Sequence, residues 1–212
     1  PGGFTMEASA KTEQGYQQII NQCYFALERR FYGTEPFIYF TEGNTDLWTT
    51  QANKSTSYTQ YLWFFAGAAP NTTYTNDLWS AIYDGIGSCN NAIALAPLAP
   101  ITDDKRNALV AQARFLRAVY YFNAVEQFGG VTVILEPAKD VDYNPQRTAP
   151  LEVYKNVIIP DLEFAVKYLD KGTDALNTIP TKKSALGFLA KAYLQTVEYD
   201  ATKEYAAKAL KT

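Results

Sequence analysis

Large aromatic side chains and hydrogen-bonding side chains alternate along residues 44–65, in a stretch that is otherwise rich in turn-forming residues. An aromatic face can stack on the flat apolar side of a ligand, while amides and carboxylates bond polar groups at its rim. The residues that combine these two chemistries are Asp46, Trp48, Asn53, Tyr58, Tyr61 and Trp63. Two interpretations are open: an exposed binding platform, or rings that pin a long loop to the fold. Asp46 could equally cap a turn, and for Phe64 and Phe65 we favour the packing role.

The sequence offers little for catalysis or metal binding. It contains no histidine, which is the commonest general base and the commonest metal ligand. Cys23 and Cys89 lack the spacing of a zinc site; we interpret them as small buried side chains, with pairing in an oxidising compartment as the alternative. Glu42 and Asp46 would suit a glycosidase, but acidic loop residues are common by chance. We expect no metal site, no cofactor and no enzyme activity.

Composition narrows the class of protein. The 212 residues are 47% hydrophobic, which is enough for a sizeable core. A net charge of -3 without a basic patch argues against nucleic acid as a partner. No apolar run is long enough to cross a bilayer. The initial PGGFTMEASA lacks the charged and apolar regions of a signal peptide, so either the protein is not exported or its export signal has been removed.

Apolar residues recur at three- and four-residue steps and predict an all-α fold. The predicted segments are a first helix at 12–33, a long aromatic loop at 34–75, core helices within 76–130, and helices at 151–169, 182–196 and 201–211. A connection as long as 34–75 is uncommon unless it is functional. The last two helices resemble a tetratricopeptide pair, because Leu189, Ala190 and Tyr193 match the pattern of its first helix.

Several residues mark where these elements begin, bend and end. Thr102 is the expected N-cap of the longest helix, and Gly129–Gly130 its stop. Asn76 is the expected cap of the preceding helix. Pro160 falls inside the helix at 151–169 and predicts a kink. The residues VTVIL after Gly130 predict a short strand.

Other residues have expected roles in the core. Trp79 begins an apolar stripe and should be buried. Asn90 lies on the same stripe, so we expect a buried amide with hydrogen-bond partners. Arg114 and Arg117 are expected either to be solvated or to pair with acidic residues of neighbouring helices.

Five segments together resemble the SusD/RagB family of outer-membrane nutrient-binding lipoproteins of Bacteroidetes. NALVAQARFLRAVYYFNAVEQFGGVTVI is similar to the family's signature helix. The other similar segments are TDLW, LWSAIYDGIGSCNNAI, VYKNVIIPDLEFAVKYL and TKKSALGFLAKAYLQ, and all five occur in the family's order. Thr132 departs from the proline that many members carry there. Because family members are much longer, we expect residues 1–212 to be the N-terminal part of a SusD-like domain, truncated at the C-terminus.

The resemblance implies a SusD-like helical fold with tetratricopeptide-like helix pairs and long irregular loops. It also implies a cell-surface lipoprotein that captures oligosaccharides, or in some members peptides, and delivers them to a SusC-like TonB-dependent outer-membrane transporter. Its lipidated cysteine would precede Pro1, since Cys23 follows no apolar leader. Sugar rings present C–H groups on one face and hydroxyls at the rim, so the aromatic loop is the expected glycan site.

The alternative function is a tetratricopeptide-type adaptor, which the single imperfect repeat and the long aromatic loop argue against. If the protein closes over a transporter barrel, its contact surface should come from the long connections 34–75 and 136–150. The second connection holds Asp140, Asp142, Tyr143, Asn144 and Arg147.

Overall fold

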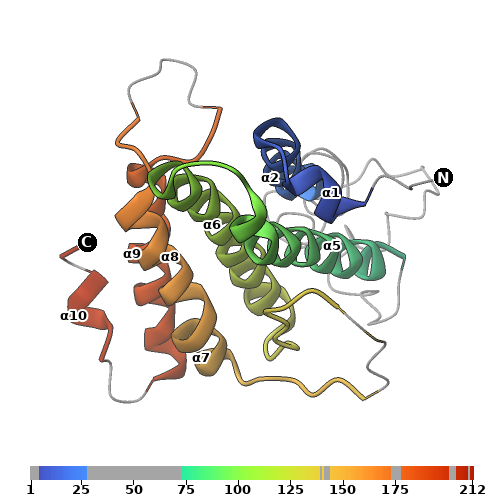
Figure 1. The fold of residues 1–212 in the computed structure, drawn as a ribbon. Helices are drawn as coiled ribbons and strands as arrows, with labels where there is room; N and C mark the ends of the chain where they lie inside the picture. The colour runs from blue at the N-terminus through green and yellow to red at the C-terminus, as the bar shows by residue number, and fades with distance from the viewer. Residues whose placement is uncertain are drawn as a thin grey trace, which may run out of the picture. The chain divides into compact units, whose positions relative to one another are not determined.

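The computed structural model describes residues 5–27, 73–138, 140, 144–172, 178–200, 204–209 and 211–212. Over these residues the chain is mainly helical and forms no strand, which confirms the all-α prediction (Figure 1). The chain divides into two compact units, residues 25–84 and the remainder. The elements are α1 (Met6–Ala10), α2 (Glu13–Ala26), α5 (Thr73–Leu95), a 3-10 turn η2 (Ala96–Leu98), α6 (Asp103–Phe128), α7 (Pro150–Val153), a π-helical turn η3 (Tyr154–Ile158), α8 (Ile159–Tyr168), α9 (Lys182–Tyr199) and α10 (Ala206–Ala209).

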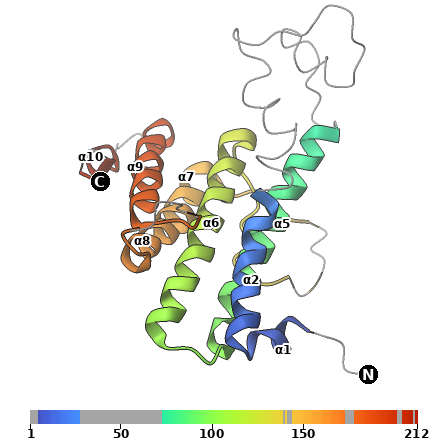
Figure 2. The ribbon, with the colours of Figure 1, turned by 90° about the horizontal axis from the view of Figure 1, so that it is seen from above.

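Helix α6 is the centre of the larger unit. It packs against α8, α8 packs against α9, and α9 packs against α10 (Figure 2). The rings of Phe115 and Phe122 on α6 meet Phe188 of α9 edge-on, with centroids 5.5 and 6.1 Å apart. Such edge-to-face pairs contribute beyond the area that they bury. Because α6 lies between neighbouring helices, its apolar residues are buried on more than one side.

Buried tyrosine hydroxyls join the elements of the larger unit. Tyr16 of α2 donates a hydrogen bond to the carbonyl of Ala92 at 3.0 Å, and Tyr120 of α6 donates to the carbonyl of Cys23 at 2.7 Å. The Tyr120 ring lies so close to Gly85 that a Cβ there would meet it at 2.4 Å. Glycine therefore permits α5 and α6 to approach each other closely at this point.

The predicted ends of α6 are confirmed. The Thr102 hydroxyl accepts a hydrogen bond from the Lys105 amide, and Gly129 ends the helix with a φ of 68°. Thr12 caps α2 in the same way, through the Gly15 amide at 3.1 Å. Because these signals are local, each is legible in the sequence.

Helix α5 differs from its prediction at its start and in its buried face. It begins at Thr73, so Asn76 is not its cap and residues 73–75 are helical. Leu78 is fully buried, whereas Trp79 is only half-buried and packs on Tyr83 with a centroid distance of 4.8 Å. The prediction that Trp79 is a core residue was wrong, because Leu78 extends the buried series of Ile82, Ile86 and Cys89.

The proline of the fourth predicted helix is accommodated by a change of helical type. Tyr154–Ile158 forms a π-helical turn, and Pro160 lies within the first two positions of α8. A proline there removes an amide hydrogen that would otherwise need a partner. The last predicted helix is shorter than expected, because α10 covers only Ala206–Ala209 in the described chain.

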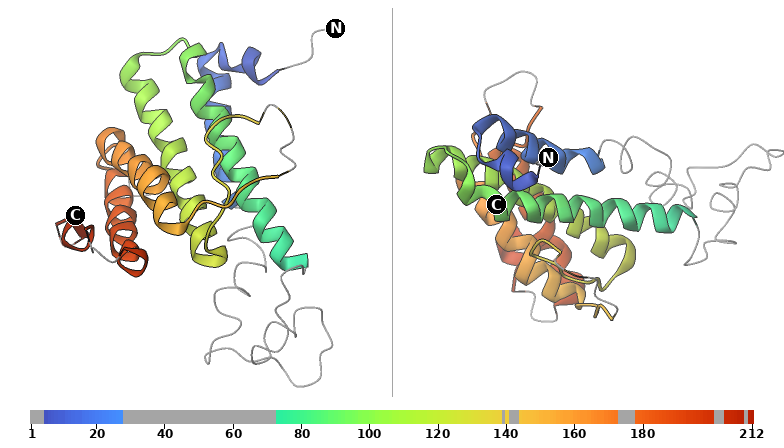
Figure 3. Two further views of the ribbon diagram at one scale, coloured as in Figure 1. Left: turned by 90° about the horizontal axis from the view of Figure 1, so that it is seen from below. Right: turned by 45° about the vertical axis from the view of Figure 1, so that its right-hand side comes forward.

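The VTVIL segment forms only one isolated β-bridge. Val131 and Thr148 exchange backbone hydrogen bonds of 3.1 and 2.8 Å. Beyond this bridge the chain continues as an extended segment beside α5 (Figure 3). Among the described residues this bridge is the only β-pairing of the predicted strand, and side chains bond the backbone of Ile134 and Leu135.

Candidate functional site

The six residues predicted to bind ligand all lie outside the described residues. Asp46, Trp48, Asn53, Tyr58, Tyr61 and Trp63 belong to residues 28–72, between α2 and α5. Of the second predicted surface, Asp142 and Tyr143 also lie outside the described part. Arg147 donates hydrogen bonds to the carbonyls of Phe128 and Gly130 at 3.2 and 3.0 Å. This arginine therefore holds the C-terminal end of α6.

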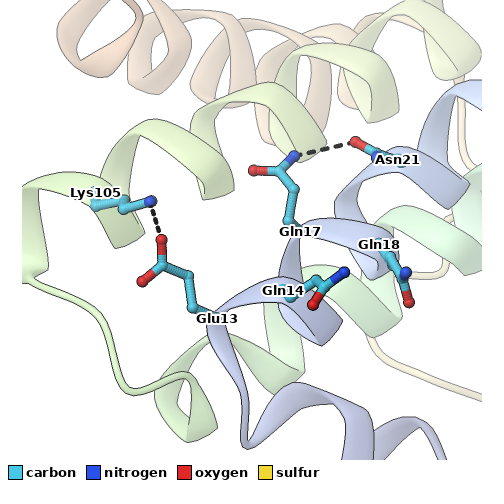
Figure 4. Close-up of a pocket in the computed structure, with 6 residues that line it drawn as sticks. All are labelled: Glu13, Gln14, Gln17, Gln18, Asn21 and Lys105. Atoms are coloured by element: carbon cyan, nitrogen blue, oxygen red, sulfur yellow. Dashed lines mark hydrogen bonds and ion pairs between the residues drawn. The ribbon is translucent and has the colours of Figure 1, made fainter.

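A polar pocket with a volume of about 600 Å³ lies between α2 and the start of α6 (Figure 4). Four of its six lining side chains are amides. The residues that line it are Glu13, Gln14, Gln17, Gln18, Asn21 and Lys105. Sequence reasoning missed this site, because polar residues on the outer face of a helix are ordinary.

Helical periodicity explains why the amides of α2 point outward. Tyr16, Ile19, Ile20 and Cys23 are buried and make up the inner face. Gln14, Gln17, Gln18 and Asn21 follow the same spacing on the opposite face. A run of four amides at helical spacing is the signal that could have revealed the pocket.

The charges at the edge of the pocket neutralise each other. Lys105 forms an ion pair with Glu13 across the gap between α6 and α2 (Figure 4). Both side chains are about half exposed, so this pair contributes little stability. Inside the pocket Gln17 donates a hydrogen bond of 3.0 Å to Asn21. The lining is therefore rich in hydrogen-bonding groups and carries no net charge.

A second polar cluster is buried in the core and is structural. Arg117 of α6 donates two hydrogen bonds to Asp161 of α8, at 2.7 and 2.9 Å, and one to Asn90 of α5 at 2.8 Å. The buried partners predicted for Asn90 and the acidic partner predicted for Arg117 are confirmed. Arg114 is half-buried, 3.7 Å from Asp161 and 4.3 Å above the Phe164 ring.

Burial and charge act in opposite directions on the ionisable groups of this cluster. Burial raises the pKa of Asp161, while the hydrogen bonds and the charge of Arg117 oppose that increase. Burial disfavours the charged form of Arg117, yet the hydrogen bonds and the charge of Asp161 raise its pKa above the ordinary value. We interpret the cluster as an ion pair that joins α6 to α8.

The same cluster holds the extended segment after α6. The Asn90 amide donates to the carbonyls of Ile134 and Glu136 at 2.9 and 3.3 Å. The Tyr121 hydroxyl accepts from the Ile134 amide at 2.7 Å and donates to its carbonyl at 2.8 Å. Backbone groups that would belong to a strand are thus satisfied by buried side chains.

The described residues show no further reactive centre. Cys23 and Cys89 are buried free thiols. The pKa of the Cys89 thiol is raised mainly by burial and also by its hydrogen bond with Cys23. No group of three or more potential ligands in this part of the chain could hold a metal ion. No helix among the described residues is long and apolar enough to cross a membrane.

Comparison with known proteins shows which family and which solved structures this chain is similar to. The SusD-like family described as "Starch-binding associating with outer membrane" matches residues 5–194. A SusD-like protein P2 of Formosa agariphila is 34% identical over 131 residues, which are 60% of this chain and 25% of that protein. A laminarin-binding SusD-like protein superposes with a TM-score of 0.76 at 24% identity, over 94% of this chain and 42% of its own.

Another crystal structure, solved with a xylogluco-oligosaccharide, superposes with a TM-score of 0.67 at 25% identity. This match covers 89% of the present chain and 34% of that protein. The chain spans only a quarter of the Formosa relative and less than half of either solved structure.

Proposed function

The chain belongs to the SusD-like family, and from this premise we propose that the protein is a cell-surface lipoprotein that binds oligosaccharides and passes them to a SusC-like TonB-dependent transporter. The observation that carries the proposal is the family match over residues 5–194. Two proteins of the same fold support a glycan ligand, since one binds laminarin and the other was solved with a xylogluco-oligosaccharide. The fold agrees over 94% and 89% of the chain.

The proposed glycan site is the aromatic loop between α2 and α5. Trp48, Tyr61 and Trp63 would stack on sugar faces, and Asp46, Asn53 and Tyr58 would bond hydroxyls at the rim. Within the larger unit, Tyr16 joins α2 to α5 and Tyr120 joins α6 to α2. Binding residues often lie on loops that a packed scaffold carries, which supports the choice of this loop.

Binding without hydrolysis fits the chemistry available. The description of the matching family is one of starch binding, and the buried Asp161 is occupied by Arg117. Cleavage of a glycosidic bond needs two carboxyl groups about 5–9.5 Å apart around the bond. We propose that the protein only holds its ligand, and that the transporter receives it.

The connection 136–150 is the proposed contact with the transporter barrel. A lid that closes repeatedly over a barrel needs a wide contact, typically more than ~1,200 Å² in total, with a polar rim. Arg147 and the Val131–Thr148 bridge hold the C-terminal end of this connection at the end of α6, and Asn90 holds its start at the carbonyl of Glu136. A lipid anchor preceding Pro1 would keep the protein at the outer membrane.

A glycan array with the full-length protein tests the proposal. We expect binding to a restricted set of neutral oligosaccharides, with no new reducing ends after prolonged incubation. Release of reducing ends would show an enzyme instead. Binding to peptides alone, or to no glycan at all, would overturn the proposed ligand class.

A further inference from the structure

The pocket between α2 and α6 has the chemistry of a neutral hydroxyl-binding site. Within Glu13–Ala26 the only charged residue is Glu13, although the exposed faces of helices are usually rich in charge. Each amide of the lining offers two donor hydrogens and one acceptor oxygen. A pair of neighbouring amides can therefore bond vicinal hydroxyls, each of which is both a donor and an acceptor.

Some side chains of the pocket already have a hydrogen-bond or ion-pair partner, and others do not. Gln17 and Asn21 bond each other at 3.0 Å, and Glu13 pairs with Lys105, so these four side chains are already held in place. Gln14 and Gln18 are exposed, and their side chains make no hydrogen bond within the described chain. Figure 4 shows them on the same stretch of α2, one turn apart. Their amides are the ones available to a ligand.

We propose that this pocket is a second carbohydrate-binding subsite, specific for neutral oligosaccharides and separate from the aromatic loop. The inference rests on the proposed function, because it assumes that the protein binds glycans. A volume of about 600 Å³ is in the range of ligand pockets. An ionic ligand is disfavoured, since the one cation and the one anion of the lining neutralise each other.

The subsite should be weak. No aromatic ring lines the pocket, so binding depends on hydrogen bonds that compete with water. We expect a Kd on the order of millimolar for an isolated oligosaccharide. A weak subsite still adds to the overall affinity for any glycan long enough to reach a second site, because binding at one site raises the effective concentration at the other.

One double variant and one control variant separate binding in the pocket from binding elsewhere on the protein. The double variant Gln14→Ala/Gln18→Ala removes the free amides and loses no hydrogen bond of the described chain. Alanine favours helix, so the variant should fold. Gln22→Ala is the matched control, since Gln22 is an exposed amide of the same helix that does not line the pocket. Thermal melting of all three proteins checks that the fold is kept.

The measurement is a titration of the full-length protein with laminarin and xyloglucan oligosaccharides, followed through side-chain amide signals in NMR spectra. A Trp48→Ala/Trp63→Ala background weakens the aromatic loop, and signals lost in the glutamine variant identify Gln14 and Gln18. With both glutamines present we expect saturable shifts of these signals. The Kd read from the Gln17 and Asn21 signals should be at least threefold higher for the double variant than for Gln22→Ala. Unmoved signals in a protein that still binds glycan through the loop would overturn only the subsite, whereas no binding by the wild-type protein would overturn the proposed function with it.

Discussion

Replacing Arg117 with methionine should destabilise the protein strongly. The substitution removes two hydrogen bonds to Asp161, one to Asn90 and one to the carbonyl of Leu135. It leaves a carboxylate that is 3% exposed with only Arg114, 3.7 Å away, as a counter-charge. Breaking a buried ion pair on one side costs about 3–5 kcal/mol. For a chain of this size each kcal/mol corresponds to about 2–4 °C in Tm, so we expect a decrease of roughly 6–20 °C.

Urea unfolding followed by circular dichroism measures this effect. The matched control is Lys105→Met on the same helix, which breaks an exposed ion pair and should cost less than about 1 kcal/mol. The double variant Arg117→Met/Asp161→Leu removes both charges and should recover about half of the loss, leaving about 1–3 kcal/mol for the unsatisfied Asn90 oxygen. A loss below about 1 kcal/mol for Arg117→Met, or a double variant worse than the single one, would refute the argument.

Three further predictions address packing, thiol chemistry and the partner. Gly85→Ala should lose about 1–3 kcal/mol in urea unfolding, because the new methyl group overlaps the Tyr120 ring; an unchanged midpoint would show that α5 and α6 separate easily. Cys23 and Cys89 should react with a thiol reagent only after unfolding, since both are buried; two unreactive cysteines in the unfolded protein would instead show a disulfide. Deleting residues 138–146 should weaken co-purification with the barrel and leave glycan binding intact, and an equally stable complex would remove this connection from the interface.

Local signals were predictable from the sequence, whereas contacts between distant residues were not. Thr102 and Gly129 act within one helical turn, and their roles were predicted correctly. Asn90 was recognised as buried because it interrupts an apolar stripe, but its backbone partners at Ile134 and Glu136 lie 44 and 46 residues away. Nothing in a single sequence indicates such pairings.

Two structural predictions were wrong, each for its own physical reason. Trp79 was placed in the core because it was assigned to the apolar stripe, yet the helical phase of α5 puts Leu78 in the inner position. The VTVIL segment has strand-forming composition, but a strand needs a neighbour, and the bridge to Thr148 is the only backbone pairing found there in the described chain. The binding role of the aromatic residues of 34–72 stays a prediction.

Titration calorimetry with a glycan identified on the array tests the central claim most directly, that the aromatic loop binds sugar. For the full-length protein we expect a Kd on the order of micromolar to millimolar. Trp48→Ala, Tyr61→Ala and Trp63→Ala should each raise the Kd by about 2- to 12-fold at unchanged Tm, because each ring contributes about 0.5–1.5 kcal/mol. If all three variants instead unfold, or if all three bind as tightly as the wild-type protein, then the rings pack the loop and the glycan site lies elsewhere.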